Sequence, residues 1–214
     1  MLKKDMIFKK ERDETAKYMR RLYDRGLTTC SGGNISCRPV DDRVLITASS
    51  IDKAYLRTED IAVLSFEGKS LTPELKTSIE TQMHLAIYKN RPDVLAVVHA
   101  HPTHASLFTA SDKKIKTDIL AEARFMLGEP AFAPYALMGT ESLAEIIGQT
   151  FSDDSVSVVL MENHGVITIG RTLHQAYDRM EVLEAAARMT ILGELLGDVK
   201  TLSDERRAAI DGMH

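Results

Sequence analysis

The stretch that most constrains the fold is the apolar run VLAVVHAH at residues 94–101, which ends at Pro102. A short, continuous apolar run closed by a proline is typical of a buried strand. Successive side chains of a strand alternate between its two faces, so His99 and His101 point to one side and Ala100 to the other. The chain therefore needs a sheet, and this strand carries two imidazoles on one face at the point where it ends.

Helical and strand patterns are interspersed along the rest of the chain without strict β-α-β alternation. Helices are expected at residues 11–25, 79–90, 142–150 and 172–196, and further strands at 44–47, 61–66, 156–161 and 166–169. Residues 111–136 show no clear period. No internal repeat or long linker divides the chain, so we expect a single α/β domain over residues 1–214, with helices packed on a mixed or largely antiparallel sheet.

Three helix starts can be predicted from their capping residues. Ser78 is expected to cap the helix at 79–90, whose buried stripe is Ile79, Met83, Ala86 and Ile87. The pair Ser142 and Glu145 fits a capping box, and so does the pair Thr172 and Gln175. The polar tail SDERRAAIDGMH is expected to be frayed.

The composition excludes several classes of protein. The net charge of −4 does not suggest a nucleic-acid footprint. Cys30 and Cys37 lack the spacing and the partners of a structural zinc site or a disulfide framework, so we expect two reduced thiols. The N-terminus has no signal-peptide pattern, and no stretch approaches the ~20 apolar residues of a membrane span. These features favour a cytoplasmic protein.

His99 and His101 have the geometry that two ligands of one Zn²⁺ ion require. Two histidines alone do not make a metal site, and ordinary hydrogen-bonded histidines are the competing interpretation. His164, in the turn sequence ENHG, is a candidate third ligand, and Glu80 is a candidate fourth ligand or acid/base. Three histidines with a carboxylate are the donor set of a catalytic zinc site, although the sequence does not show that the four converge.

The other histidines near this stretch are weaker candidates. His84 lies four residues after Glu80 on the same helix face, where a second-sphere or structural partner is the more common role. His104 follows Pro102 and lies off the strand pairing, so it is not expected to bind the metal. His174 is expected at the surface.

Two polar stretches have the composition of a phosphate-binding loop. In TTCSGGNIS at residues 28–36, Gly32 and Gly33 free the backbone to present N–H groups, and Asn34 adds a side-chain hydrogen bond. The stretch TASS at residues 47–50 follows a strand in the same way. Turn-rich segments are common, and neither stretch is a Walker or dinucleotide fingerprint.

Taken together in chain order, these motifs resemble the class II aldolase/adducin family, and above all its L-fuculose-1-phosphate aldolases. The motifs are SGGNIS, VLITASS, the spacing S-x-E-x-x-x-H, RPDVLAVVHAHPTHA, FAPYALMGTESLAE and VVLMENHGVITIG, and they cover residues 12–195. The combination of H-A-H-P with a downstream N-H-G and an upstream glutamate is specific as a set.

The resemblance implies a fold, a metal and a reaction. It implies one α/β domain with a largely antiparallel central sheet flanked by helices, assembled as a homotetramer. His99, His101 and His164 match the zinc ligands, and Glu80 matches the carboxylate that binds zinc at rest and acts as acid/base. The residues that match the binding stretches for the phosphate of the sugar substrate are Gly33, Asn34, Ser49, Ser50 and Ser78. The implied reaction cleaves a ketose 1-phosphate into dihydroxyacetone phosphate and an aldehyde.

The chain departs from the family pattern at three places. Ser49-Ser50 stands where members often have T-G, and Ser78-Ile79-Glu80 stands where S-S-E is usual. No tyrosine lies between Lys113 and Ala131. A sugar-phosphate 4-epimerase, a methylthioribulose-phosphate dehydratase and a non-enzymatic adducin-like binding domain therefore remain alternatives, although a glutamate at position 80 favours the aldolase.

Overall fold

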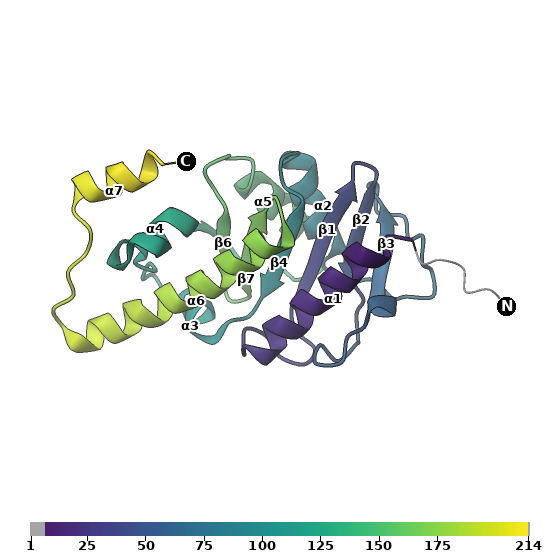
Figure 1. Cartoon of the computed structure of the whole chain (residues 1–214), viewed down its shortest axis with the longest axis horizontal. Helices are drawn as coiled ribbons and strands as arrows, with labels where there is room; N and C mark the ends of the chain where they lie inside the picture. The colour runs from purple at the N-terminus through teal and green to yellow at the C-terminus, as the bar shows by residue number, and fades with distance from the viewer. Residues whose placement is uncertain (1–6, 214) are drawn as a thin grey trace.

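The computed structural model describes residues 7–213, which form one α/β fold built on a single seven-stranded sheet (Figure 1). The strands are β1 (Asn34–Val40), β2 (Arg43–Thr47), β3 (Ile61–Ser65), β4 (Ala96–Ala100), β5 (Ala131–Ala133), β6 (Val158–Met161) and β7 (Gly165–Gly170), in the spatial order β3-β2-β1-β4-β7-β6-β5. The helices are α1 (Lys9–Asp24), α2 (Thr81–Asn90), α3 (Thr103–Phe108), α4 (Ala121–Leu127), α5 (Glu141–Thr150), α6 (Leu173–Leu196) and α7 (Asp204–Asp211). Two short 3₁₀ turns are η1 (Thr58–Asp60) and η2 (Thr117–Ile119).

The sheet is mixed, which corrects the expectation of a largely antiparallel sheet. Strand β5 runs parallel to β6 at the edge, whereas the other pairings between the described strands are antiparallel. The chain reaches β5 through η2 and α4, which lie within residues 111–130. The sequence of that segment has no clear period, so the parallel edge was not foreseeable from it.

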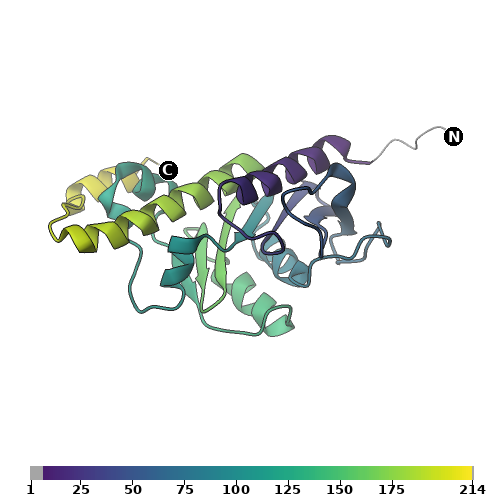
Figure 2. The ribbon, with the colours of Figure 1, turned by 90° about the horizontal axis from the view of Figure 1, so that it is seen from below.

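Helices cover both faces of the sheet. Helices α1 and α6 lie along one face, and α2 and α5 pack together on the other, as the two perpendicular views show (Figures 1 and 2). Strand β4 divides its side chains between the two layers: Val98 and Ala100 belong to the core under α1 and α6, and Val97 to the core under α2 and α5. Because side chains two residues apart share a face, His99 points to the α2 side of the sheet.

Strand β4 is fully buried, as its apolar run predicts, and it pairs with β1 on one side and β7 on the other. Its central position follows from composition: a strand without exposed polar residues is stable only where both its faces and both its edges are covered. Strand β1 was not foreseen, because its buried positions include Asn34 and Ser36, and such polar residues are typical of a turn.

Two predicted helix starts are corrected. Helix α2 begins at Thr81 with Glu80 as its N-cap, so Ser78 precedes the helix and Ile79, which was expected in the buried stripe, is 55% exposed. Helix α5 is capped by Thr140, whose hydroxyl accepts a hydrogen bond from the Leu143 N–H, rather than by Ser142. The Thr172 cap of α6 is confirmed, because its hydroxyl accepts from the Gln175 N–H.

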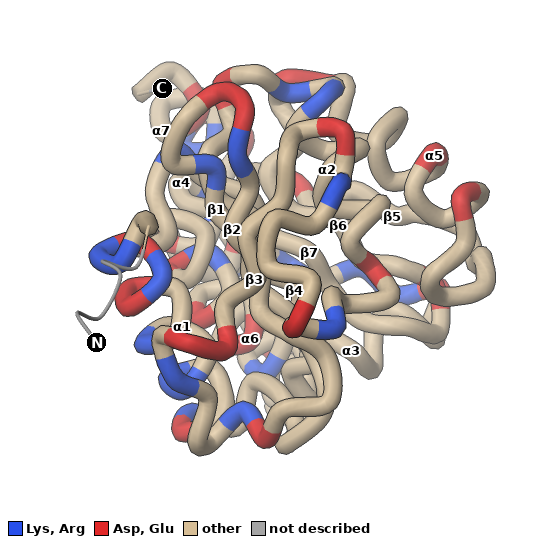
Figure 3. The backbone as a smooth tube through the Cα atoms, turned by 90° about the vertical axis from the view of Figure 1, so that its right-hand side faces the viewer, with Lys and Arg blue, Asp and Glu red and all other residues tan. Residues whose placement is uncertain are grey.

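The tail expected to be frayed instead forms α7. This helix contributes no buried residue, and it is joined to the rest of the chain by ion pairs of Arg124 with Asp211 and of Arg207 with Asp118. Acidic and basic residues are interspersed along α1 and the loops around it in the view of Figure 3. Among residues 7–213, no helix combines the length and apolarity needed to span a bilayer.

Candidate metal centre

Three histidines from neighbouring strands meet on the α2 side of the sheet. His99 lies on β4, His101 follows the end of that strand, and His164 lies in the turn between β6 and β7. One ring nitrogen from each lies within 4.8 Å of the others. The ring centroid of His99 lies 4.7 Å from that of His101 and 5.0 Å from that of His164. The structure therefore brings together the three histidines that the sequence singled out.

The β6–β7 turn depends on the local sequence ENHG. Asn163 adopts a left-handed conformation with φ of 51°, which asparagine tolerates better than most residues. A Cβ atom at Gly165 would lie 2.4 Å from His101 Cδ2 and 2.8 Å from the Ala100 carbonyl oxygen. A glycine at this position is thus what lets the turn approach β4 closely enough for His164 to reach the other two histidines.

A hydrogen bond to the backbone fixes the tautomer and the ring orientation of His99. Its Nδ1–H donates to the Val166 carbonyl oxygen at 3.0 Å, so its Nε2 carries the lone pair. Burial lowers the pKa of His99, which is completely buried. Burial also lowers the pKa of His101 to about 3, with added repulsion from His99 and His164. These two imidazoles are therefore neutral at pH 7, which is the form that binds a metal ion.

Glu80, at the N-cap of α2, places its carboxylate against the histidines. Its Oε1 lies 2.9 Å from His164 Nε2, and its Oε2 lies 3.3 Å from His99 Nε2 and accepts a hydrogen bond from Asn34 Nδ2 at 2.7 Å. Burial opposes ionisation of this carboxyl, but the neighbouring His99, His164 and Asn34 together hold the pKa of Glu80 well below its ordinary value. The group is therefore a carboxylate at neutral pH.

Two atoms of this cluster are buried without a hydrogen-bond partner among the described residues: His99 Nε2 and Glu80 Oε1. Each lies close to another member of the cluster, but the contact lacks hydrogen-bond geometry. Because buried polar atoms are almost always satisfied, two such atoms aimed at one place indicate a shared partner. Three imidazoles and a carboxylate are the donor set of a catalytic divalent-metal site, so the residues fit a metal ion.

A family model matches most of the chain. The family model of the class II aldolase and adducin N-terminal domain matches residues 13–191. The chain belongs to this family. The expectation of an enzyme of the aldolase type is confirmed by the relatives and solved structures that it resembles.

The names of several relatives of this chain refer to different substrates. An L-fuculose phosphate aldolase of Methanococcus vannielii is 37% identical and aligns over 82% of this chain and 93% of its own length. A 5-deoxy-D-ribulose 1-phosphate aldolase of Bacillus thuringiensis is 29% identical over 94% of this chain and 93% of its own. A 3-oxo-tetronate 4-phosphate decarboxylase of Haemophilus influenzae is 32% identical over 79% and 81%, respectively.

A solved L-fuculose 1-phosphate aldolase has the same fold. Its structure superimposes with a TM-score of 0.83 at 28% identity, and the alignment covers 94% of each chain. The class II aldolase fold thus extends over nearly the whole of the chain described here.

The other three histidines within residues 7–213 lie outside the cluster formed by His99, His101 and His164. His84 is fully buried, and it bonds to Asn34 and Ser36 rather than to Glu80. His104 Nδ1 lies 2.7 Å from Glu184 Oε1 on α6, and His174 is exposed.

The stretches expected to bind phosphate lie next to one another. Asn34 Nδ2 donates to Ser78 Oγ at 3.1 Å, and the Ser49 N–H donates to the Lys76 carbonyl oxygen at 2.8 Å. The turn at Ser50 has a positive φ of 62°. Gly33 also has a positive φ, and a Cβ there would lie 2.7 Å from the His99 carbonyl oxygen, so the glycine lets this loop pack on β4. All five predicted residues therefore lie in three adjoining segments beside the candidate metal centre.

Sequence reasoning missed Lys53, which lies among these segments. The side chain is buried, and its Nζ donates to the Ala48 carbonyl oxygen at 3.2 Å. Its backbone N–H donates to the Cys30 carbonyl oxygen, which joins the 28–33 loop to the 48–50 turn. Burial lowers the pKa of Lys53, and no carboxylate lies within ion-pair distance of it in the described part of the chain. The pattern IDKAYL gives no sign that this lysine is buried.

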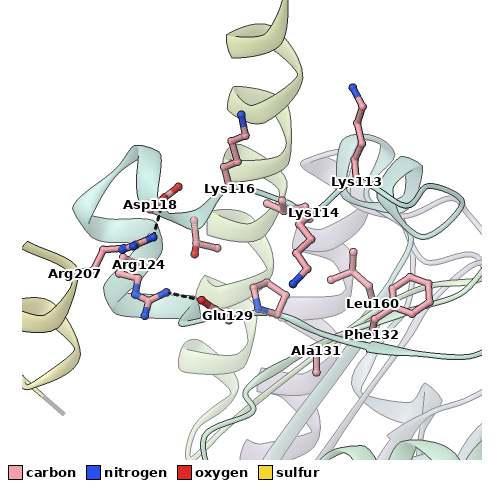
Figure 4. Close-up of a pocket in the computed structure, with 13 residues that line it drawn as sticks. Lys113, Lys114, Lys116, Asp118, Arg124, Glu129, Ala131, Phe132, Leu160 and Arg207 are labelled. Carbon is pink, nitrogen blue, oxygen red and sulfur yellow. Dashed lines mark hydrogen bonds and ion pairs between the residues drawn. The ribbon is translucent and has the colours of Figure 1, made fainter. Parts of the chain in front are cut away.

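A separate cavity of about 210 Å³ lies between the 113–118 segment, α4, β5 and α7 (Figure 4). Its lining includes Lys114, Arg124 and Arg207. Arg124 pairs with Glu129 as well as with Asp211, and Arg207 pairs with Asp118. The arginine charges of this cavity are therefore balanced by carboxylates.

Proposed function

We propose that the protein is a zinc-dependent class II aldolase that cleaves a ketose 1-phosphate of the L-fuculose-1-phosphate type into dihydroxyacetone phosphate and an aldehyde. The observation that carries the proposal is the convergence of Glu80 Oε1 with the three histidines, where a buried carboxylate oxygen has no hydrogen-bond partner among the described residues. His99, His101, His164 and Glu80 would hold the ion. A bound divalent ion supplies Lewis-acid stabilisation of the negative charge that develops on the ketose oxygens when the C3–C4 bond breaks.

Glu80 is the group that moves the protons. Cleavage removes the proton of the C4 hydroxyl, turns that O–H electron pair into the aldehyde C=O bond, and leaves the C3–C4 electron pair on the dihydroxyacetone fragment. Protonation at C3 completes the reaction. The proton lost and the proton gained balance, so one carboxylate serves both transfers. Glu80 is a carboxylate at neutral pH, which is the form that can accept the first proton.

The phosphate is held by the adjoining polar segments. Gly33, Ser49, Ser50 and Ser78 offer backbone N–H and hydroxyl groups, with Asn34 at their junction. Lys53 adds a buried positive charge next to them. Contacts to a part of the substrate that does not react position the reacting carbons, and this is the role we assign to these segments.

A decarboxylase of a 3-oxo acid phosphate is a second candidate, because one relative at 32% identity has that name. Loss of CO₂ from a 3-oxo acid also leaves negative charge beside a carbonyl, so the same donor set serves it. The two candidates differ in the bond that breaks, and hence in the product.

We also infer assembly with further copies of the chain, as a homotetramer. The support is the exposure of five large apolar side chains on β5, on the loop that follows it and just before α2, namely Ile79, Phe132, Tyr135, Leu137 and Met138. Ile79 lies beside Gly139, at the end of the same loop. Large apolar side chains exposed on adjoining segments are typical of an interface between subunits.

A substrate panel tests the proposal. The purified protein is incubated with L-fuculose 1-phosphate, 5-deoxy-ribulose 1-phosphate, a ketose 5-phosphate and 3-oxo-tetronate 4-phosphate, and dihydroxyacetone phosphate and CO₂ are both measured. We expect dihydroxyacetone phosphate from the ketose 1-phosphates. Release of CO₂ alone would establish the decarboxylase, and the absence of both products would refute the proposed reaction.

A further inference from the structure

A continuous line of hydrogen bonds runs through the interior from Tyr88 on α2 to the carboxylate of Glu80. The Tyr88 hydroxyl lies 2.8 Å from Ser36 Oγ, and Ser36 Oγ lies 2.6 Å from His84 Nδ1. His84 Nε2 bonds to Asn34 Oδ1, and Asn34 Nδ2 donates to Glu80 Oε2 at 2.7 Å. Every member is at most 7% exposed, so water does not compete for these groups. We call these five residues the buried relay.

The direction in which hydrogen bonds are donated along the relay follows from Tyr88, the member farthest from Glu80. The Tyr88 hydroxyl has no hydrogen-bond partner other than Ser36 within residues 7–213, so it is satisfied as a donor only by giving its proton to Ser36 Oγ. The Ser36 hydroxyl then donates to His84 Nδ1, which leaves the ring proton on Nε2. That N–H donates to Asn34 Oδ1, so the amide nitrogen faces Glu80. Burial keeps Tyr88 protonated by raising its pKa well above 10.

Hydrogen-bond donation in the opposite direction is unfavourable both at Tyr88 and at Glu80. With the ring proton on Nδ1 of His84, the Ser36 hydroxyl would donate to Tyr88, whose own proton would have no acceptor. The Asn34 amide would turn its oxygen toward the Glu80 carboxylate. A buried group left without its hydrogen bond destabilises the fold, and more so where a charge is involved. The tautomer of His84 therefore decides whether Asn34 donates to Glu80 or repels it.

We propose that His84, held by Ser36 and Tyr88, is a positioning residue for the acid/base Glu80, acting through the Asn34 amide. The relay holds the carboxylate by Oε2 and leaves Oε1 free toward the histidine cluster. His84 touches neither substrate nor metal. This inference rests on the proposed function, because it assumes that Glu80 transfers the protons.

The test compares two substitutions of His84. Leu fills much of the same space but has no N–H to donate, whereas the amide of Gln can donate to Asn34 Oδ1 as Nε2 does. We expect His84→Leu to lower kcat on L-fuculose 1-phosphate by ~10- to 100-fold, the usual effect of losing an outer-sphere partner, with KM and metal content unchanged. His84→Gln should recover most of that loss. Solvent deuterium exchange at C3 of dihydroxyacetone phosphate should follow kcat.

A second pair of variants covers the case in which His84→Leu does not fold. Tyr88→Phe removes only the hydroxyl that sets the direction of the relay, and it should lower kcat several-fold. Tyr177→Phe is the matched control, because Tyr177 is equally buried but lies on α6, outside the relay. Its kcat should equal that of the wild type. Equal kcat in Tyr88→Phe and Tyr177→Phe would overturn the proposal, as would a Gln variant as impaired as the Leu variant.

A double-mutant cycle separates this inference from the proposed function. If His84 acts through Glu80, then adding His84→Leu to Glu80→Gln should lower the residual activity by less than ~2-fold, because coupled residues are not additive. Multiplication of the two losses would show an independent role for His84 and overturn the inference. Full activity of Glu80→Gln alone would instead refute the proposed role of Glu80.

Discussion

The candidate metal centre and the cavity of Figure 4 are both clusters of ionisable side chains, but these side chains differ in how deeply they are buried and in whether they are paired. In the metal centre, His99 is completely buried, Glu80 is 7% exposed, and each has an atom without a hydrogen-bond partner in the described chain. In the cavity, the lysines are exposed, and Arg124 and Arg207 are paired with carboxylates. Of these two clusters, it is the candidate metal centre that holds buried side-chain atoms without a hydrogen-bond partner, whereas the arginines of the cavity are paired.

This difference shows which property marks a reactive site. A dense patch of exposed charge is stable in water and needs no ligand, since surface ion pairs contribute only about 0–1 kcal/mol. Buried donors and acceptors without partners are costly, so a fold retains them where a ligand or a reaction completes them. We therefore expect substitutions in the metal centre to change the chemistry, and those at the cavity to leave it unchanged.

The largest loss of activity is expected for His101→Ala. The protein as purified should contain about one divalent ion per chain, and the variant should lose the ion and the activity together. We expect a fall of more than ~10³-fold, because Lewis-acid stabilisation is worth several kcal/mol. Metal analysis, turnover and far-UV circular dichroism check this together. Full metal occupancy in the variant would remove His101 from the site.

The next effect in size is that of Glu80→Gln. The amide keeps the size of the side chain and can still accept from Asn34, but it has no basic site at neutral pH. We predict a loss of ~10²–10⁴-fold in kcat with the metal retained, which is the usual contribution of a positioned acid/base. Wild-type turnover and proton exchange in this variant would make Glu80 a structural helix-start residue, and the proton transfer would then be assigned elsewhere.

A smaller effect, on binding rather than on chemistry, is expected for Lys53→Met. Methionine keeps most of the length of the buried stem and removes the charge. KM for a phosphorylated ketose should rise about tenfold, because a hydrogen bond to a charged group contributes ~1.5 kcal/mol, whereas kcat should change little. Competition by inorganic phosphate should weaken in parallel. An unchanged KM would limit Lys53 to its contact with the Ala48 carbonyl oxygen.

The smallest effect is expected at the cavity. Arg207→Ala breaks the ion pair with Asp118, and kcat and KM should both stay within ~2-fold of the wild type, because surface ion pairs contribute little. Lys114→Ala, which removes an exposed lysine from the same cavity, serves as the matched control. A tenfold change in KM in either variant would contradict the comparison and connect the cavity to the substrate.

The sequence predicts the apolar strands of the sheet, the edge strand β3 included, better than strands β1 and β5. Strand β4 is recognisable because it is apolar throughout and ends at a proline, and the spacing of His99 and His101 then follows from the alternation of a strand. The approach of His164 and Glu80 is a tertiary feature, and the family resemblance rather than local pattern gave it. The parallel edge strand β5 and helix α7 were missed because their segments have no apolar period.

The buried relay shows why part of the site could not be predicted. Asn34 and Ser36 are polar and follow two glycines, so local preference favours a turn, but their hydrogen bonds to Glu80 and His84 make them interior residues of β1. Lys53 is hidden from sequence reasoning for the same reason: burial of a polar group depends on partners that lie far away along the chain.

The strand order has a consequence for how the enzyme family can change substrate. Strands β4 and β7 lie in the middle of the sheet, with β1 and β6 on either side, so the backbone that carries His99 and the His164 turn opens only when much of the domain unfolds. The segments assigned to the phosphate are turns outside these strands and open at lower free energy. Hydrogen exchange should therefore be slowest at β4 and β7 and much faster at residues 28–33 and 48–50. A sheet arranged in this way lets the turns vary in sequence while the candidate metal ligands keep their positions.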